Sequence, residues 1–86
     1  MTLRKVHWYK IQLITMTDVQ HFVHLAEQSG LNLKLCDNDK NYMVNASSLL
    51  GVRYSLEWDS LYLISEEDVY TTFKNYIVES TIRYQK

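Results

Sequence analysis

The chain has 86 residues, a length suited to one domain with one hydrophobic core, so we expect a single domain over residues 1–86. Its composition, 47% hydrophobic and 13% aromatic, excludes the polar, proline-rich type of disordered protein. Nine Lys and Arg stand against ten Asp and Glu, for a net charge of −1. This balance argues against a nucleic-acid or membrane-surface binder, which would carry a strongly basic face.

One cysteine, Cys36, cannot form an internal disulfide, and small secreted domains usually contain several. We therefore expect a cytoplasmic protein. The first 16 residues lack the apolar region of a signal peptide, and no segment approaches the roughly 20 apolar residues of a membrane span. With two glycines and no proline, the chain has no glycine-rich phosphate loop, and no cofactor is predicted.

The first half of the chain predicts a strand followed by an amphipathic helix. In Val6–Ile14, apolar and polar residues alternate as they do in a half-buried strand. Thr15 or Thr17 can cap the next helix, and Gly30 suits the left-handed position after its end. Apolar residues of this helix recur at intervals of three and four: Met16, Val19, Phe22, Val23 and Ala26.

Two short strands, Leu31–Leu35 and Tyr42–Val44, are predicted to form a hairpin through the polar turn 37–40. A short helix over Asn45–Val52 and a strand over Ser60–Ile64 follow.

A last helix is predicted to begin at Ser65–Asp68, where a serine precedes three acidic residues, as in a capping box. Its apolar stripe would consist of Val69, Phe73, Ile77 and Tyr84. The element order is then βαββαβα. It predicts an α/β protein of the α+β type, with an antiparallel sheet and its helices on one face.

One segment and this element order resemble the HPr family, the phosphocarriers of the bacterial sugar phosphotransferase system. Ser48-Leu49-Leu50-Gly51-Val52, with Ser55-Leu56 after it and Asn45 before it, is similar to the family's regulatory-serine segment. Residues 22–35 resemble its first helix and second strand. The resemblance implies an open-faced sandwich, with a four-stranded sheet of order 1-4-2-3 under three helices.

The chain departs from this family at the phosphorelay histidine. The resemblance places Thr15 on the family histidine, Thr17 on its arginine and Asp18 on its proline. A threonine phosphate is a stable ester rather than a labile phosphoramidate, and Asp18 would repel an incoming phosphate. We therefore expect no phosphocarrier activity and no catalytic residues.

Ser48 has two compatible interpretations. The resemblance implies a site that an HPr kinase phosphorylates, which would add negative charge at a helix N-terminus. Alternatively, Ser47 or Ser48 is only the N-cap of a short helix. Leu49, Leu50 and Gly51 match the family's partner-facing positions; the two leucines form either an exposed docking patch or part of the core.

The remaining candidate residues favour structural roles. His21 and His24 share a helix face, but two ligands do not make a metal site, so none is predicted. His21 lies too far inside the helix to replace the missing histidine, and His7 has no evident partner. Cys36 is expected to be a packed thiol. The carboxylates at 66–68 are explained by capping, and the tyrosines and two tryptophans by core and rim contacts.

Three functions remain open. The first is a non-catalytic, HPr-like regulatory domain that binds a protein partner, such as a phosphotransferase-system component or HPr kinase, under control of Ser48. The second is a phosphocarrier that uses a displaced histidine. The third is a small-molecule-binding regulatory module, which would have a pocket at an interface. Neither nucleic-acid binding nor membrane insertion is expected.

Overall fold

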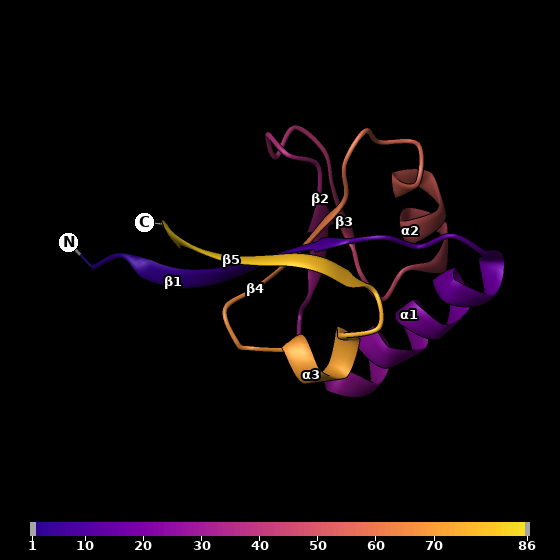
Figure 1. Cartoon of the computed structure of the whole chain (residues 1–86), viewed down its shortest axis with the longest axis horizontal. Helices are drawn as coiled ribbons and strands as arrows, with labels where there is room; N and C mark the ends of the chain where they lie inside the picture. Colours follow the sequence, from indigo (N-terminus) through magenta and orange to yellow (C-terminus); the bar gives the residue numbers. More distant parts are fainter. Residues whose placement is uncertain (1, 86) are drawn as a thin grey trace.

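The computed structural model describes residues 2–85, which form one five-stranded antiparallel sheet and three helices (Figure 1). The sheet order is β3-β2-β4-β1-β5. The three helices contribute to one core on one side of the sheet. No helix among these residues is long and apolar enough to cross a membrane. In chain order the elements are β1 (Arg4–Ile11), α1 (Met16–Ser29), β2 (Lys34–Cys36), β3 (Met43–Asn45), α2 (Leu49–Ser55), β4 (Tyr62–Ser65), α3 (Tyr70–Phe73) and β5 (Ile77–Gln85).

The first four strands have the order 1-4-2-3, as expected, and every pairing is antiparallel. The expected number of strands was wrong, because β5 adds a fifth strand beside β1. This strand pairs with β1 from Arg4↔Gln85 to Ile11↔Ile77. In Figure 1, β1 and β5 form a ribbon that extends beyond the helices, and the pair Arg4↔Gln85 lies at its far end.

The predicted long C-terminal helix is also wrong, because α3 is a single turn. Val69 and Phe73 are buried as predicted, but Tyr84 is 64% exposed on β5 rather than in the core. The segment Ile77–Gln85 is rich in β-branched and aromatic residues, which favour a strand, and β1 offers an edge along its whole length.

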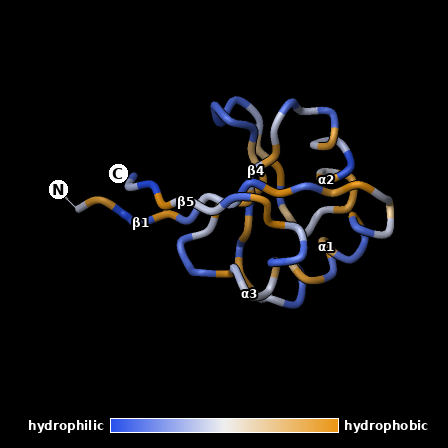
Figure 2. The backbone as a smooth tube through the Cα atoms, in the orientation of Figure 1, coloured by the Kyte–Doolittle hydropathy of each residue, from blue (hydrophilic) through white to orange (hydrophobic). Residues whose placement is uncertain are grey.

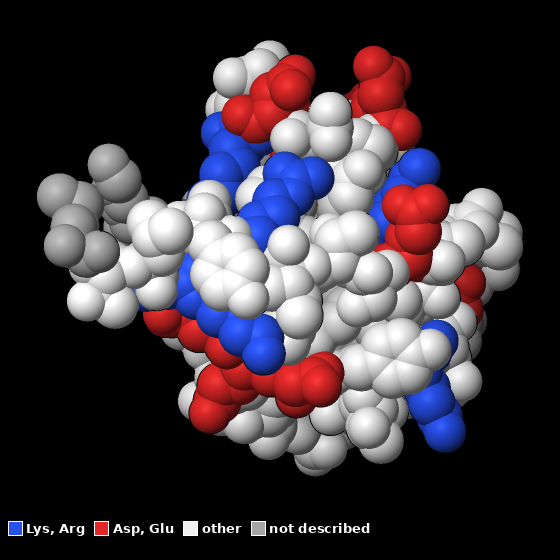
Figure 3. Space-filling model, turned by 60° about the vertical axis from the view of Figure 1, so that its left-hand side comes forward, with Lys and Arg blue, Asp and Glu red and all other residues white. Residues whose placement is uncertain are grey.

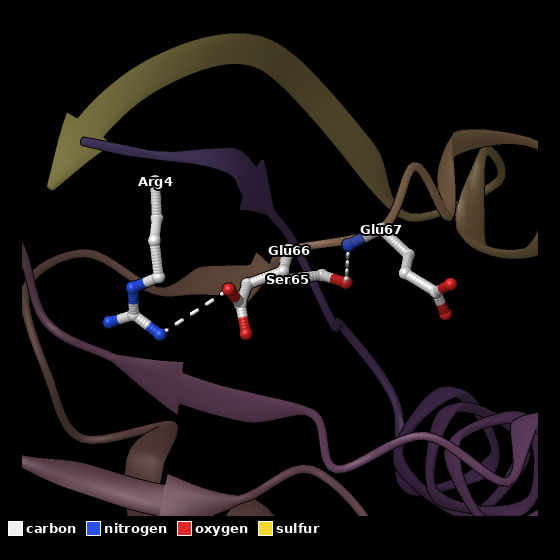
Figure 4. A network of polar contacts seen from close by, with 4 residues as sticks. All are labelled: Arg4, Ser65, Glu66 and Glu67. Carbon is white, nitrogen blue, oxygen red and sulfur yellow. Dashed lines mark hydrogen bonds and ion pairs between the residues drawn. The ribbon is translucent and has the colours of Figure 1, made fainter. Parts of the chain in front are cut away.

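Ser65 is therefore not a helix cap but the last residue of β4. Figure 4 shows its Oγ accepting a hydrogen bond of 3.1 Å from the backbone N–H of Glu67. The Glu66 carboxylate points to Arg4, with 3.3 Å between Oε1 and Nη1. This exposed ion pair contributes little to stability.

The α1 helix forms for the predicted reasons. The Thr15 Oγ1 accepts from the Asp18 N–H, and the Asp18 carboxylate accepts from the Thr15 N–H, a complete capping box. Gly30 ends the helix in the left-handed conformation, with φ of 70°. The predicted stripe is buried except for Met16, which is 44% exposed: Val19, Phe22, Val23 and Ala26.

The sheet has buried residues on both faces. The main core lies between the sheet and the helices, where Figure 2 shows hydrophobic stretches meeting. On the opposite face, a small cluster surrounds Trp8, which is only 2% exposed. The guanidinium of Arg83 lies 3.7 Å from the centre of a Trp8 ring and the Lys40 ammonium 5.5 Å from it, so cation–π contacts help to cover the indole.

Candidate functional site

An open cleft of about 730 Å³ lies between two loops. One loop joins β2 to β3, and the other joins α2 to β4; both rise at the top of Figure 1. The volume lies within the usual range for small-molecule pockets. We call this site the aromatic–acidic cleft; its lining residues are Asp37, Asn38, Asp39, Tyr42, Tyr54, Glu57, Trp58, Asp59, Ser60 and Tyr62.

Three aromatic rings form one wall of the cleft. The ring of Tyr42 lies 5.9 Å from that of Trp58 at an angle of 24°, so the two are nearly parallel. The ring of Tyr54 lies 6.2 Å from Trp58 on centroids and is perpendicular to it. Both tyrosines are more than half exposed, so their ring surfaces are open to a ligand.

Trp58 connects this wall to the interior. Its side chain is half-buried and packs against the main core. Its Nε1 is buried and has no hydrogen-bond partner among the residues that the structure describes. A ligand would therefore meet the indole through its ring surface rather than through its N–H group.

The cleft carries negative charge. Four carboxylates line it, on Asp37, Asp39, Glu57 and Asp59, whereas no Lys or Arg is among its lining residues. Figure 3 shows acidic side chains on two projections at the top of the molecule, where these loops lie. Asp37 also holds the first loop in shape, because its Oδ1 accepts a hydrogen bond of 3.1 Å from the Tyr42 N–H.

This arrangement suits a cation that has an apolar surface. Aromatic ring faces carry negative potential and attract ammonium groups, most strongly when several rings surround one group. Carboxylates at the rim add long-range attraction. The same lining offers no activated nucleophile, because its groups are carboxylates, phenols, an amide, an indole and the hydroxyl of Ser60.

The predicted regulatory segment begins α2. Ser48, not Ser47, is the N-cap: its Oγ accepts a hydrogen bond of 3.1 Å from the Gly51 N–H. Leu50 is 76% exposed and Leu49 41%, so both predicted docking side chains reach the surface. Gly51 packs closely, since a Cβ there would lie 3.1 Å from the Val44 Cβ and 3.2 Å from the Ser48 Oγ. Gly51 lies inside α2, which spans Leu49–Ser55.

Of the two threonines that the resemblance to HPr placed at active-site positions, Thr15 has a structural role. Thr15 is exposed and caps α1, and Thr17 is exposed in its first turn. The backbone N–H groups of Ile14 and Thr15 donate to the Asp18 carboxylate and lower its pKa. A negative charge held at this helix start disfavours a second anion there.

The three histidines lie apart from the cleft. His21 Nδ1 is 2.5 Å from the hydroxyl of Tyr76, which joins α1 to the segment before β5. Burial, followed by the charge of Asp18, raises the pKa of Tyr76. His24 is exposed, and His7 stacks on Tyr9 with 5.8 Å between ring centroids. Within residues 2–85, no group of three or more His, Cys, Asp or Glu side chains could hold a metal ion.

Cys36 is fully buried, as expected of a packed thiol. Burial raises its pKa to about 11, which keeps it protonated and unreactive at neutral pH.

Comparison with known proteins gives no relative: no family model, curated protein or solved structure matches this chain.

Sequence reasoning missed the cleft. It treated residues 37–40 as a turn and the aromatic residues as core and rim. The local signal was the run Glu57-Trp58-Asp59, in which two acidic residues flank an aromatic one, together with Tyr42 close after the acidic turn. That these segments face each other depends on the pairing of β2 with both β3 and β4.

Proposed function

We propose that this chain is a non-catalytic binding module whose aromatic–acidic cleft holds an alkylammonium group. The observation that carries the proposal is the Tyr42–Trp58–Tyr54 wall, with a perpendicular ring pair, beside four carboxylates. Cation–π attraction favours a cation over a neutral group of equal shape, and the carboxylates reinforce this preference.

The alkylammonium group can belong to a free molecule or to a methylated lysine of a protein. Both present the same methylated cation to the rings, so the chemistry of the cleft is shared. A titration distinguishes them: choline against its neutral carbon isostere, 3,3-dimethylbutanol, and a trimethyllysine peptide against the same peptide with unmodified lysine. Calorimetry and Trp58 fluorescence measure the binding.

We expect choline or the trimethyllysine peptide to bind and the neutral isostere to bind at least several-fold more weakly. Tyr54→Leu should weaken binding about two- to fivefold, the effect of one partly exposed cation–π contact. Tyr70→Leu is the matched control, because Tyr70 is similarly exposed but lies outside the cleft. Equal affinity for choline and its isostere would contradict the proposal.

A second function is supported by the start of α2. Ser48 caps this helix and Leu50, two residues later, is 76% exposed, which suits a protein-docking surface controlled by a serine phosphate. In this proposal the chain is an HPr-like regulatory domain of the phosphotransferase system that cannot relay phosphate. The strand order 1-4-2-3 of its first four strands is compatible with it.

The intact mass of the protein after two incubations tests this second function. An HPr kinase with ATP should add one phosphate, and Ser48→Ala should abolish the addition while Ser47→Ala retains it. Enzyme I with phosphoenolpyruvate should add none. An acid-labile phosphate in the enzyme I incubation, lost on replacing His7, His21 and His24, would instead establish a displaced phosphohistidine.

A further inference from the structure

The two edges of the sheet differ in length. β3, at one edge, has three residues, whereas β5, at the other, has nine. An edge strand presents a row of backbone N–H and C=O groups without partners, and proteins usually protect long edges with proline, lysine or bulges. The chain has no proline, β5 contains no lysine, and its one register shift lies at its beginning, beside Lys10 and Ile11.

The side chains of β5 alternate between two faces. One face carries three exposed apolar side chains, Val78, Ile82 and Tyr84, which are 60%, 47% and 64% exposed. The other face carries the opposite charges Glu79 and Arg83. The single ion pair among residues 2–85 joins Arg4 and Glu66, so neither charge on β5 has an ion-pair partner among these residues.

The spacing of these side chains is complementary to itself. When two copies of a strand pair about a two-fold axis perpendicular to the sheet, side chains of one strand face lie on the same side of the joint sheet in both copies. A residue that precedes the central residue by a given number of positions then lies opposite the residue that follows it by the same number in the other copy. With Thr81 at the centre, Glu79 lies opposite Arg83 of the other copy, and Val78 lies opposite Tyr84. Both are favourable cross-strand pairs.

The neighbouring two-fold registers lose this match. Centred on Ser80, the pairing places Arg83 opposite Ile77 and Glu79 opposite Thr81. Centred on Ile82, it places Arg83 opposite Thr81 and Glu79 opposite Gln85. Only the centre at Thr81 pairs the two unlike charges, and it does so twice, once on each side of the axis.

We propose that β5 pairs antiparallel with β5 of a second copy of this chain, centred on Thr81, so that two five-stranded sheets join into one of ten strands. The aromatic–acidic cleft has no lining residue from β1 or β5, and it lies toward the opposite edge of the sheet. The dimer therefore leaves both clefts open, and the inference is independent of the proposed ligand.

Charge reversal on the full chain tests the register. Glu79→Arg places two like charges across each pair in a homodimer, and so does Arg83→Glu. We expect the unchanged chain to be dimeric at 0.1–1 mM, on the order of NMR concentrations, by analytical ultracentrifugation, and each single variant to dissociate at least tenfold more readily. An equimolar mixture of the two variants should form a heterodimer, since every pair is then unlike.

Two controls make the result decisive. Glu27→Arg makes the same charge change on α1 and should leave the dimer intact, and thermal melting shows whether each variant is folded. Thr81→Cys should form an intermolecular disulfide under mild oxidation, because Thr81 faces itself across the axis. Ser80→Cys should not form a disulfide, since residue 80 lies opposite Ile82 of the other copy and not opposite its own equivalent. A monomeric unchanged chain at 1 mM, or single variants as dimeric as that chain, would overturn the proposal.

Discussion

The hydroxyl of Tyr9 on β1 donates a hydrogen bond of 2.8 Å to the Oδ1 atom of Asp68, 59 residues further along the chain. The same hydroxyl accepts from the Val69 N–H at 3.0 Å, and the Tyr70 N–H donates to the same Asp68 oxygen. Tyr9 is fully buried. These contacts hold the segment at the start of α3 against the sheet. The chain continues from this segment through α3 to the turn before β5.

This contact predicts a loss of stability at alkaline pH. Burial, and then the hydrogen bond to Asp68, raise the pKa of Tyr9 from 10.0 to about 12. The folded protein thus keeps the Tyr9 proton longer than the unfolded chain. The contribution of Tyr9 is fully present below pH 10 and declines as pH rises toward 12, by roughly 2 to 3 kcal/mol in all.

Urea unfolding between pH 8 and 12 measures this loss. Tyr9→Phe should be less stable at pH 8 by about 1 kcal/mol, for the lost hydrogen bonds, and should show a shallower decline above pH 10. Tyr84→Phe, at an exposed tyrosine, should follow the unchanged chain. An identical decline in Tyr9→Phe would show that other groups control alkaline unfolding.

The capping role of Thr15 gives a second prediction. Thr15→Ala removes the acceptor for the Asp18 N–H and should lower the free energy of unfolding by about 1 kcal/mol. Thr17→Ala, at an exposed position, should change it by less than about 0.5 kcal/mol. Denaturant unfolding of the two variants compares them directly. An equal loss of unfolding free energy in the two variants would contradict the assignment of Thr15 as the cap.

How far the sequence predicted the fold depended on whether a signal was local. The α1 helix was predicted well because its apolar spacing, its Thr15 cap and Gly30 all lie within one segment. The last segment was not. The interval of four between Val69, Phe73 and Ile77 indicated a helix, while the β-branched residues from Ile77 onward favoured a strand. Pairing with β1, at the far end of the chain, decides between them.

The candidate site was not predicted from the sequence, because it also depends on contacts between distant segments. No local pattern shows that Tyr42 stacks on Trp58, because these residues belong to different loops and meet only after β2 has paired on both sides. The sequence predicted a helix cap at Ser47 or Ser48, and the structure shows that it is Ser48. The sequence left open whether Leu49 and Leu50 are buried, because a seven-residue helix is too short for its periodicity to identify one face.

Two adjacent serines at the start of α2 give a third prediction. Ser48→Ala removes the acceptor for the Gly51 N–H and should destabilise the protein by about 1 kcal/mol, whereas Ser47→Ala should have little effect. Ser48→Asp keeps an acceptor at the cap and should restore most of the loss. Melting temperatures of the three variants measure their order of stability. A larger loss for Ser47→Ala than for Ser48→Ala would mean that Ser47 is the cap.

The carboxylates of the cleft give the last prediction. Asp39 and Asp59 are exposed and make no hydrogen bond or ion pair through their side chains in the structure, so replacing both with Asn removes two charges without disturbing the Asp37–Tyr42 contact. Each exposed charge close to a cation contributes on the order of 0.5 kcal/mol, so choline affinity should fall roughly fivefold in the double variant.

The dependence of this affinity on salt should fall as well, because attraction between exposed charges is screened over about 10 Å at 0.1 M salt. Calorimetric titration with choline at 20 and 200 mM NaCl measures both effects. The pair Glu27→Gln and Glu67→Gln changes the net charge by the same amount outside the cleft and should leave the affinity nearly unchanged. An equal loss in the two double variants would mean that choline responds to the overall charge of the protein, and the carboxylates of the cleft would then have no specific part in binding.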